Sequence, residues 1–571
     1  MSSKKFEKTL ETDVVIIGSG AGGACAAWGI ANKGIDTLVI EKGDWLKDDT
    51  YDDDELHYYI LKKGWPSIEN EYSMADLYRG KESKERPHRM GQSYGCVGGG
   101  TIYYAGVSSR FYREDFEKYK IWGDIPGANL ADWPKGFYEE IGPYYSQAEE
   151  LIGVSGDYSN DYARFNQLNH RPRLLPPLPY HKIGERLNDA AKELGWNPFP
   201  IPLALNSIYN EKTNSNWCIS SGMCSGYPCA WGAKNSVDQV VLSNLVDKPN
   251  FSILTNTLAA FAETDSKGNI SGVVCINRSS KEKFFVKAKA VILACSGILS
   301  PLFCLNSQTK QHQNGLGNSN DLVGRNLMFH IEGQRGAQFD GDFGNEEFHN
   351  LKKVMVTDFY IPDQSDEFVN HMSIQMGSKS GPIRYVLSKV PEGWGRQYLK
   401  DMHKNYMQYH ELQAMCEDLP QLSNRVTAAD RKDVDGMPVA HIHHRFHKMD
   451  GLAFIKTMEK MEQWLQAGGG KMITGISSDM VEWKRLIDQG EDIPPMRRPY
   501  GYHLMGTLRM GDDPDRSVVN RYCQFHEVPN LFCVDSSIFP TSAGVNPTLT
   551  IQANALRVAD KIINLSRSQW K

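Results

Sequence analysis

The stretch TDVVIIGSGAGGACAAWGIANKGIDTLVIEKG, from Thr12 to Gly43, decides the fold of this chain. It begins with VVIIG, residues 14–18, a continuous apolar run that is typical of a strand buried on both faces. An alanine-rich stretch that favours a helix follows over residues 21–33. TLVIEKG then predicts a second buried strand, which ends at Glu41. The pattern therefore predicts a strand–helix–strand unit of an α/β sheet.

Three glycines lie between the first strand and the helix, in the spacing G-x-G-x-x-G. Gly18 permits a tight turn, Gly20 lets the backbone approach a pyrophosphate, and Gly23 lets helix and strand pack closely. The helix N-terminus presents free N–H groups to phosphates. The carboxylate of Glu41 can accept hydrogen bonds from ribose hydroxyls, which favours FAD or NAD over NADP. The residues expected to contact such a dinucleotide are Gly18, Ser19, Gly20, Ala21, Gly22, Gly23 and Glu41. The alternative is a glycine-rich turn in an unrelated α/β unit.

The composition of the chain indicates which broad classes of protein it can belong to. Hydrophobic residues make up 40% and charged residues 23% of the 571 residues, which is typical of a globular protein. The net charge of −6 gives no reason to expect a nucleic acid or another polyanionic partner. We find no apolar run of about 18 residues, so we expect no membrane span. The N-terminus lacks the apolar core of a secretory signal, and eleven cysteines in so long a chain do not indicate a disulfide scaffold. These features favour the cytoplasm.

A second glycine cluster, MGQSYGCVGGGTIYYAG, runs from Met90 to Gly106. Three glycines in a row cannot form the interior of a stable helix or strand. They indicate either backbone held close to a flat or charged group, or a flexible loop. Further along, residues 133–156 predict a helix that breaks near Gly142 and Pro143. Residues 330–490 mix strand-like and helical segments, and we expect them to form a sheet-based second domain.

Two clusters in the middle of the chain could bind metal. Cys218, Cys224 and Cys229 lie close together and could hold an iron–sulfur cluster or zinc, or could simply pack. The segment HIHHRFH, residues 441–447, contains no acid or cysteine at ligand spacing, so ordinary surface or half-buried histidines are the favoured interpretation. We predict no metal-ligating residues.

The C-terminal part adds two motifs. NLFCVDSS predicts a buried strand that ends at Asp535, and GVNPTLTIQANALRVADKI predicts a turn followed by a helix. The N-terminus of that helix, with Asn546 beside it, can stabilise negative charge. The stretch GYHLMGT contains His503, which on its own is more often a structural histidine than a proton acceptor.

Taken together, these motifs resemble the glucose–methanol–choline (GMC) family of FAD-dependent alcohol oxidoreductases. The resemblance rests on the Gly18–Gly23 loop, the VGGGT stretch, residues 133–156, AVILACSGILSP, GLGNSNDLVGRNLMFH, and the H-x-x-G-T-x-R-M-G and G-x-N-P-T-x-T segments. It implies bound FAD, with His503 and Asn546 as the catalytic pair. His503 would accept the hydroxyl proton as hydride leaves carbon for flavin N5, and Asn546 would bond the same oxygen. Further cofactor contacts implied by position are Gly99, Thr101, Leu258, Asp535, Asn546 and Thr548.

The motifs are most similar to the sugar-oxidising branch, such as pyranose oxidase, glycoside 3-oxidases and the gluconate and fructose dehydrogenases. This implies oxidation of a sugar or glycoside hydroxyl to a carbonyl, with oxygen, a quinone or a partner protein as electron acceptor and a homo-oligomer as one expected state. Tyr103 stands where pyranose oxidase has a flavin-bonded histidine, so we expect non-covalent FAD. The spacing of the three cysteines departs from that of members with an iron–sulfur cluster. The alternatives are a GMC oxidoreductase of a non-sugar alcohol and a GMC-like lyase with redox-silent FAD.

The expected architecture has two domains. A Rossmann-like FAD-binding α/β domain is expected from residues 1–130, 235–330 and 495–571. An α+β substrate-binding domain, built on a mainly antiparallel sheet and containing the cysteine loop, is expected from residues 131–234 and 331–494.

Overall fold

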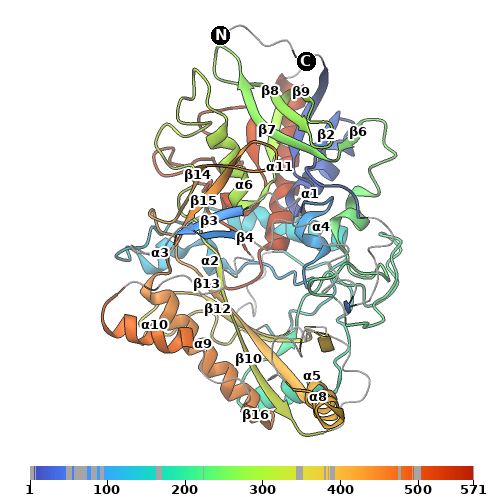
Figure 1. Ribbon diagram of the computed structural model, residues 1–571, viewed down its shortest axis with the longest axis vertical. Coiled ribbons are helices and arrows are strands. Elements are labelled where there is room, and N and C mark those ends of the chain that lie inside the picture. The colour runs from blue at the N-terminus through green and yellow to red at the C-terminus, as the bar shows by residue number, and fades with distance from the viewer. Residues whose placement is uncertain are drawn as a thin grey trace.

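The computed structural model describes residues 6, 8–46, 55–56, 74–78, 86–89, 95–161, 170–222, 224–341, 352–377, 381–383, 385, 393–472, 478–491, 493 and 503–569. The described residues form three sheets, and the two largest occupy opposite halves of the molecule (Figure 1). The third has four strands in the order β14 (Arg425–Lys432), β15 (Pro438–His443), β3 (Met74–Tyr78) and β4 (Arg86–Arg89). Within these ranges, no helix has the length and apolar character needed to span a bilayer.

The first sheet has a parallel core built from the predicted nucleotide-binding unit. Its neighbouring strands are β6 (Phe251–Leu254), β2 (Thr37–Ile40), β1 (Thr9–Ile17), β9 (Lys283–Leu293) and β17 (Leu531–Cys533). Ile17 pairs with Ile40 on one side and with Leu293 on the other, so these strands end at one edge. Ligands of open α/β sheets bind outside the carboxyl ends of the strands, and this edge faces the second half of the molecule.

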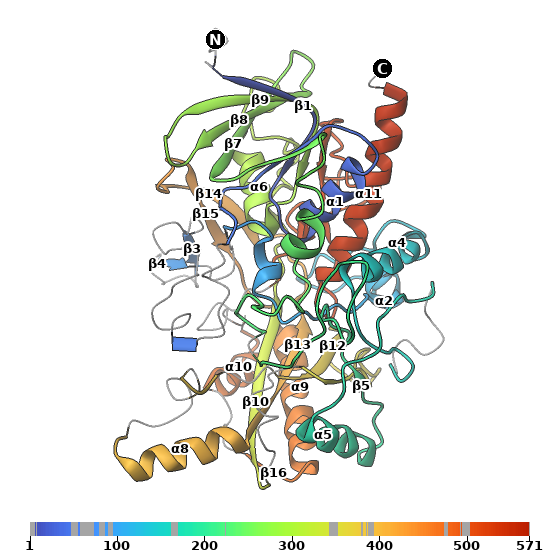
Figure 2. The same cartoon turned by 90° about the vertical axis from the view of Figure 1, so that its right-hand side faces the viewer.

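On the side away from β1, strand β9 pairs with two different strands along its length. Its first half pairs antiparallel with β8 (Ile270–Asn277), which in turn pairs with β7 (Thr257–Thr264), whereas its last residues pair parallel with β17. Helix α1 (Ala21–Ala31) connects β1 to β2 and packs against α11 (Thr548–Gln569). Figure 2 shows these two helices side by side, so the two ends of the chain meet in one domain.

Helix α4 (Phe137–Ile152) corrects one sequence prediction. It runs without a break through Pro143, where we expected an interruption. A proline inside a helix removes one backbone hydrogen bond, but Pro143 is exposed, so water can satisfy the carbonyl that loses its donor. The helix also packs against α11, close to the first sheet. The expected domain boundaries stay a prediction.

The second sheet is antiparallel throughout, as the predicted fold class requires. Its strands, in spatial order, are β16 (Gly470–Met472), β10 (His330–Phe339), β13 (Tyr409–Glu417), β12 (Met372–Met376), β11 (Val354–Val356) and β5 (Phe199–Pro200). The other elements are β3 (Met74–Tyr78), β4 (Arg86–Arg89), α2 (Arg113–Phe116), α3 (Lys118–Trp122), α6 (Ser296–Asn306), α8 (Arg396–Gln408), β14 (Arg425–Lys432), β15 (Pro438–His443) and α10 (Ser478–Asp488).

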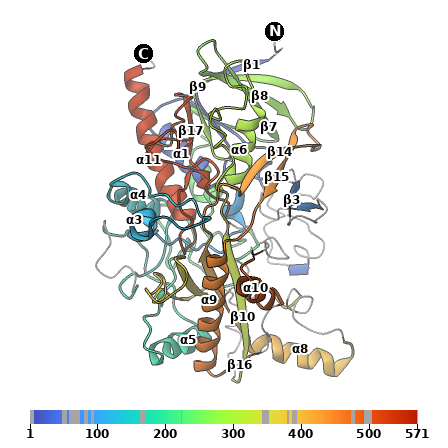
Figure 3. The ribbon, with the colours of Figure 1, turned by 90° about the vertical axis from the view of Figure 1, so that its left-hand side faces the viewer.

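The two faces of the second sheet differ in polarity. Ile331, Ile374 and Leu412 belong to an apolar cluster with α5 (Lys182–Glu193) and α9 (Lys448–Ala467), and Figure 3 shows α9 lying along β10. Because successive strand side chains point to opposite faces, the intervening positions point the other way. Those positions hold His330, Glu332, Ser373, Gln375 and Gln413. The polar face therefore looks toward the first sheet.

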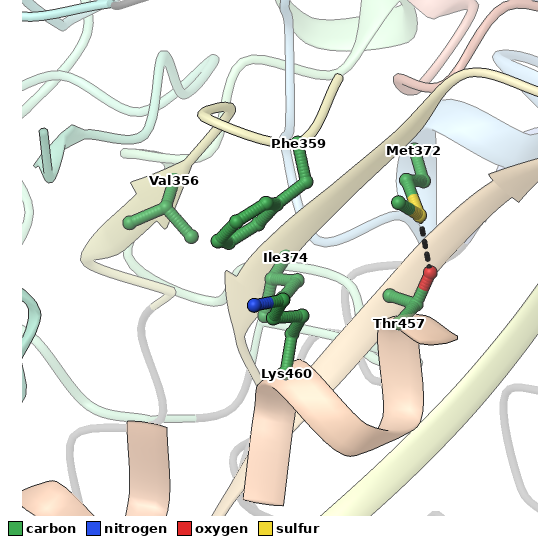
Figure 4. A pocket seen from close by; sticks show the side chains of 6 residues that line it. All are labelled: Val356, Phe359, Met372, Ile374, Thr457 and Lys460. Atoms are coloured by element: carbon green, nitrogen blue, oxygen red, sulfur yellow. Dashed lines mark hydrogen bonds between the residues drawn. The ribbon is translucent and has the colours of Figure 1, made fainter. Parts of the chain in front are cut away.

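A small, tightly lined pocket lies on the helix-covered face of this sheet (Figure 4). Its lining is mainly apolar, and the hydroxyl of Thr457 already donates to Met372 Sδ at 2.7 Å. The ammonium group of Lys460 lies 4.6 Å from the centre of the Phe359 ring. None of its lining residues belongs to the predicted catalytic pair.

A buried ion pair ties α4 to the segment that follows the second glycine cluster. Arg110 Nε lies 2.7 Å from Glu149 Oε1, and the two side chains are 1% and 0% exposed. Arg110 Nη2 also donates to Glu149 Oε2 at 2.7 Å. Removing one partner of such a pair leaves the other charge buried and uncompensated.

We expect Arg110→Met to lower the free energy of unfolding by about 3–5 kcal/mol, because Glu149 would lose its counter-charge. The matched control is Lys287→Met, which removes a pair with Glu11 whose side chains are 60% and 69% exposed, and which should change stability by less than about 1 kcal/mol. Thermal and denaturant unfolding measure both. Equal effects of the two substitutions would contradict the structural role of the buried pair.

Candidate active site

His503 is brought to the second sheet by a short antiparallel pairing. Met328 and Met505 exchange two backbone hydrogen bonds of 3.0 Å each. His330 lies two residues after Met328 and His503 two residues before Met505, so the same register places the two histidines opposite each other. Their Nδ1 atoms lie 2.7 Å apart. The pairing therefore brings His330, at the start of β10, next to His503 of the GYHLMGT stretch.

The direction of the hydrogen bond between the histidines follows from what His330 contacts on its other side. His330 Nε2 lies 2.8 Å from the carbonyl oxygen of Ser542 and 2.9 Å from that of Ala543. Carbonyl oxygens only accept, so Nε2 carries the proton. Burial lowers the pKa of His330 to about 4, which leaves the ring neutral and Nδ1 an acceptor. His503 Nδ1–H must therefore donate, and the lone pair of His503 lies on Nε2.

Backbone geometry explains how two successive carbonyls reach one nitrogen. Ala543 has φ of 60°, in the left-handed region that few non-glycine residues adopt. Its neighbours hold it there: Gly544 N donates to Tyr360 Oη at 2.9 Å, and Ser373 Oγ donates to the Gly544 carbonyl at 2.7 Å. An added Cβ on Gly544 would lie 2.7 Å from the His371 backbone. This loop is therefore fixed by the second sheet.

His503 combines a neutral ring with access from outside. Burial, together with the neighbouring His330 and Lys352, lowers its pKa well below the usual value. Its side chain keeps 14% of its surface exposed, whereas His330 is 1% exposed. An imidazole that is neutral at pH 7, with its lone pair on the free nitrogen, can accept a proton.

Asn546 ends the same loop, just before α11. Its Oδ1 accepts a hydrogen bond of 2.8 Å from Gln375 Nε2 on β12. With the amide oxygen engaged in this way, the amide presents its N–H groups as donors. Asn546 is only partly buried. A proton acceptor and a hydrogen-bond donor are thus held by one loop and one sheet.

The two glycine-rich stretches meet at the carboxyl edge of the first sheet. Ser19 Oγ donates to Glu41 Oε2 at 2.6 Å and accepts from Gly98 N at 3.2 Å. An added Cβ on Gly99 would lie 3.2 Å from the Cα of Gly20. The VGGGT stretch is therefore an ordered part of the predicted dinucleotide loop, and its last three residues begin a short 3₁₀ helix, Gly99–Ile102.

The glycine loop itself fits a phosphate-bearing ligand. An added Cβ on Gly23 would lie 2.0 Å from the Gly18 carbonyl oxygen, so Gly23 serves packing. On Gly20 the added Cβ meets no atom within 4 Å, so that side of the loop is open. On α11, both amide atoms of the buried Gln552 lack a hydrogen-bond partner in the described part of the chain, and a bound polar group could supply one.

The remaining predicted cofactor contacts lie around this edge. Asp535 accepts from the Ser296 and Ser537 backbone N–H groups at 3.0 and 2.9 Å, and Thr101 Oγ1 donates to the Gly98 carbonyl at 2.8 Å. Leu258 follows Thr257, whose N–H donates to the Glu41 carbonyl at 3.0 Å. Thr548 opens α11 and is partly exposed. Gly18, Ala21 and Gly22 belong to the loop and first turn of α1. Their contacts with a cofactor stay predictions.

The clusters that could bind metal do not assemble a site. In the portions described above, no three His, Cys, Asp or Glu side chains form a group that could hold a metal ion. Cys218, Cys224 and Cys229 are unpaired, and burial raises the pKa of Cys218 and Cys224. His444 Nε2 lies 2.7 Å from Asp418 Oδ2, an ordinary buried contact.

Sequence reasoning missed His330, Glu332, Lys352, Gln375 and Gln413. A signal was present for most of them: His330, Glu332, Gln375 and Gln413 alternate with apolar residues along strands whose other face is buried. Such alternation indicates a polar surface on one face, but it does not say what that surface meets.

Comparison with known proteins finds matches over most of the chain. The GMC oxidoreductase family matches residues 13–332 and 420–555. The chain is 29% identical to 6'''-hydroxyparomomycin C oxidase of Streptomyces lividus and 28% identical to paromamine 6'-oxidase of Streptomyces fradiae, in each case over 96% of this chain and 91% of the relative. Its fold is similar to pyridoxine 4-oxidase from Mesorbium loti, with a TM-score of 0.61 at 16% identity over 97% of this chain and 99% of that chain.

We expect Gly20→Val to fold but to purify without FAD, because its side chain would occupy the open side of the loop where a pyrophosphate approaches. The comparison is Gly23→Ala, whose added methyl group meets the Gly18 carbonyl and should reduce the yield of folded protein itself. The ratio of flavin to protein absorbance, with circular dichroism as the check on folding, distinguishes the two. A Gly20→Val protein with a full complement of flavin would contradict the role given to the loop.

Proposed function

Because this chain belongs to the GMC oxidoreductase family, we propose that it oxidises a hydroxyl of a sugar or glycoside to a carbonyl. The family match makes it an FAD-dependent oxidoreductase that acts on alcohol groups. The sugar-like substrate, the roles of single residues and the electron acceptor are the parts that we propose.

Two observations support a substrate rich in hydroxyl groups. Two of the relatives at 28–29% identity are named as oxidases of 6'''-hydroxyparomomycin C and paromamine, which are aminoglycosides. A third, at 28% identity, is named 2-methyl-1,2-propanediol dehydrogenase, which keeps a non-sugar alcohol as the alternative. The face of the second sheet that looks toward His503 is also polar, with Glu332, Gln375 and Gln413 on neighbouring strands. Sites that recognise polar substrates need such precisely held hydrogen-bonding groups. Among sugar hydroxyls, the 3-position of a glycoside is the finer expectation.

The arrangement of His503 and Asn546 carries the proposal. His503 Nε2, the ring nitrogen with the lone pair, accepts the proton of the substrate hydroxyl. Asn546 Nδ2–H donates to the same oxygen, which stabilises the negative charge that develops as the proton leaves. His330 keeps His503 in the required tautomer. When bound, FAD supplies the acceptor for the hydride that leaves the carbinol carbon.

The residues that would hold FAD follow from the carboxyl edge of the first sheet. The Gly18–Gly23 loop and the first turn of α1 would bind the pyrophosphate, Glu41 the ribose, and Gly99 the flavin side of the cofactor. Tyr103 is 3% exposed and packs with Cys96 and Tyr227, so we propose that FAD is held without a covalent bond.

Reoxidation distinguishes an oxidase from a dehydrogenase. The two relatives compared above are named as oxidases, whereas another relative at 28% identity is named as a dehydrogenase. Oxygen, a quinone and a partner protein are therefore the proposed acceptors. All eleven cysteines are unpaired, which supports a reducing compartment such as the cytoplasm.

A GMC enzyme for a non-sugar alcohol and a lyase with redox-silent FAD are the competing functions. Anaerobic bleaching of the flavin by sugars, tested against simple alcohols, separates all three.

We expect His503→Ala to retain FAD and to reduce the rate of substrate-driven flavin reduction by about 10²–10⁴-fold, because the proton acceptor is lost. Anaerobic stopped-flow absorbance with a panel of sugars and glycosides measures this. The matched control is His403→Ala on α8, an exposed histidine, which should react at the parent rate. Flavin reduction at an undiminished rate in the His503 variant would show that another group accepts the proton.

A further inference from the structure

A buried lysine lies at the centre of the polar face of the second sheet. Lys352 lies two residues before β11, and 5% of it is exposed. Its Nζ donates to Gln375 Oε1 at 3.0 Å and also to Gln413 Oε1. An ammonium group has donors and no acceptor. Both glutamine oxygens must therefore face Lys352.

This requirement fixes the direction of two further hydrogen bonds. With Oε1 toward the lysine, each glutamine turns its Nε2 the other way. Gln375 Nε2 donates to Asn546 Oδ1 at 2.8 Å, and Gln413 Nε2 donates to Glu332 Oε2 at 2.9 Å. An amide can be placed either way round when its surroundings allow it, but here an ammonium group leaves one choice for each.

The two branches end at the two groups that act on substrate. In the first branch, Asn546 receives a hydrogen bond on its oxygen and can present only N–H groups to a substrate. In the second branch, Glu332 Oε1 lies 3.7 Å from His503 Nδ1. That nitrogen carries the proton, and it shares the positive charge once Nε2 has accepted a second proton. A carboxylate at this place would stabilise the imidazolium.

We propose that Lys352 is a positioning residue that, through Gln375 and Gln413, orients the Asn546 amide as a donor and holds the Glu332 carboxylate beside His503. The inference rests on the proposed roles of His503 and Asn546. In this proposal the Lys352 ammonium group, which is outside direct contact with His503 and Asn546, determines how both residues present their polar atoms to a substrate.

The charges around the lysine are consistent with this role. Burial lowers the pKa of Lys352, and Glu332 and Glu411 oppose that shift. Burial raises the pKa of Glu332, and Lys352 opposes that shift. The groups that act on this pair are His503, beside Glu332, and Glu411 of β13, beside Lys352. Each charge thus favours the ionised form of the other, and loss of one leaves its partner uncompensated.

The next residue, Lys353, provides a matched control. It is 4% exposed, and burial lowers its pKa to about 8, but the groups that oppose this shift are Cys218 and Cys224. Lys352 and Lys353 are therefore equally buried neighbours with different surroundings. A general effect of removing a buried lysine would appear in both variants, whereas an effect on the active site would appear in one.

The first test compares Lys352→Met with Lys353→Met as purified holoenzymes. In Lys352→Met we expect flavin reduction at saturating substrate to slow about 10–100-fold, as misplaced catalytic groups do. The acid limb of its pH profile should move to higher pH, because loss of the cation raises the pKa of both His503 and Glu332. Lys353→Met should keep the parent rate and pH profile. Equal behaviour of the two variants would overturn the proposal.

The second test isolates the Asn546 branch. Gln375→Glu keeps the size of the side chain and an acceptor for Lys352, but its carboxylate cannot donate to Asn546 Oδ1, so the amide should turn round. We expect the plateau rate to fall about 10²–10³-fold, as when one transition-state donor is removed. Asn546→Ala should show a similar loss, and the double variant should show little more, because both changes remove one hydrogen bond. Additive losses, or a Gln375→Glu variant at the parent rate, would overturn this branch even if Lys352→Met fails to fold.

A readout that needs no turnover separates this inference from the proposed function. The rate at which diethylpyrocarbonate modifies His503, taken as the difference from His503→Ala, reports the neutral imidazole as a function of pH. Lys352→Met should shift that titration to higher pH, and Lys353→Met should not. The inference fails if the Lys352→Met titration matches the parent, whereas the proposed function fails if His503→Ala reduces flavin at the parent rate.

Discussion

The contact between His330 and two backbone carbonyls is the constraint on which the active site depends. The carbonyl oxygens of Ser542 and Ala543 can only accept, so they place the single proton of His330 on Nε2 and leave Nδ1 to accept from His503. The lone pair of His503 is therefore on Nε2 because of two carbonyl groups that bond His330. The loop that carries these carbonyl groups adopts a left-handed conformation at Ala543, a local strain of about 1–3 kcal/mol that the surrounding packing must offset. Tyr360 and Ser373 supply part of that packing.

The second constraint is the meeting of two differently built sheets. The parallel sheet ends at the glycine loops, and the antiparallel sheet lies in the other half of the molecule (Figure 1). The strand positions opposite its apolar cluster hold polar side chains, so its polar face looks toward the glycine loops. Helices α5 and α9 cover its other face with apolar side chains. Strand β10 begins at this junction with His330 and continues with Glu332. The side chains that act on substrate can therefore be held by hydrogen bonds between strands, which are more rigid than contacts between loops.

Local patterns in the sequence predicted the first sheet and its glycine loop, because a buried strand, a turn and a helix follow one another within residues 12–43. His503 and Asn546 were reached only by resemblance, since a single histidine carries no local signal. Their support could not be predicted: the pairing of Met328 with Met505 joins segments 177 positions apart in the numbering, and Lys352 contacts residues of two other strands. Pro143 shows the opposite case. Its local pattern predicted a break in the helix, but the affected turn is exposed, so water can replace the lost hydrogen bond and the helix continues.

The tautomer of His503 is the most direct test of this account. Nitrogen-15 NMR of histidine-labelled holoenzyme at pH 7, with the signal assigned by its loss in His503→Ala, reports which ring nitrogen carries the proton. The account predicts a neutral ring protonated at Nδ1, with an unprotonated Nε2. A ring protonated at Nε2, or at both nitrogens, would contradict it, because His503 would then have no lone pair to offer a hydroxyl group.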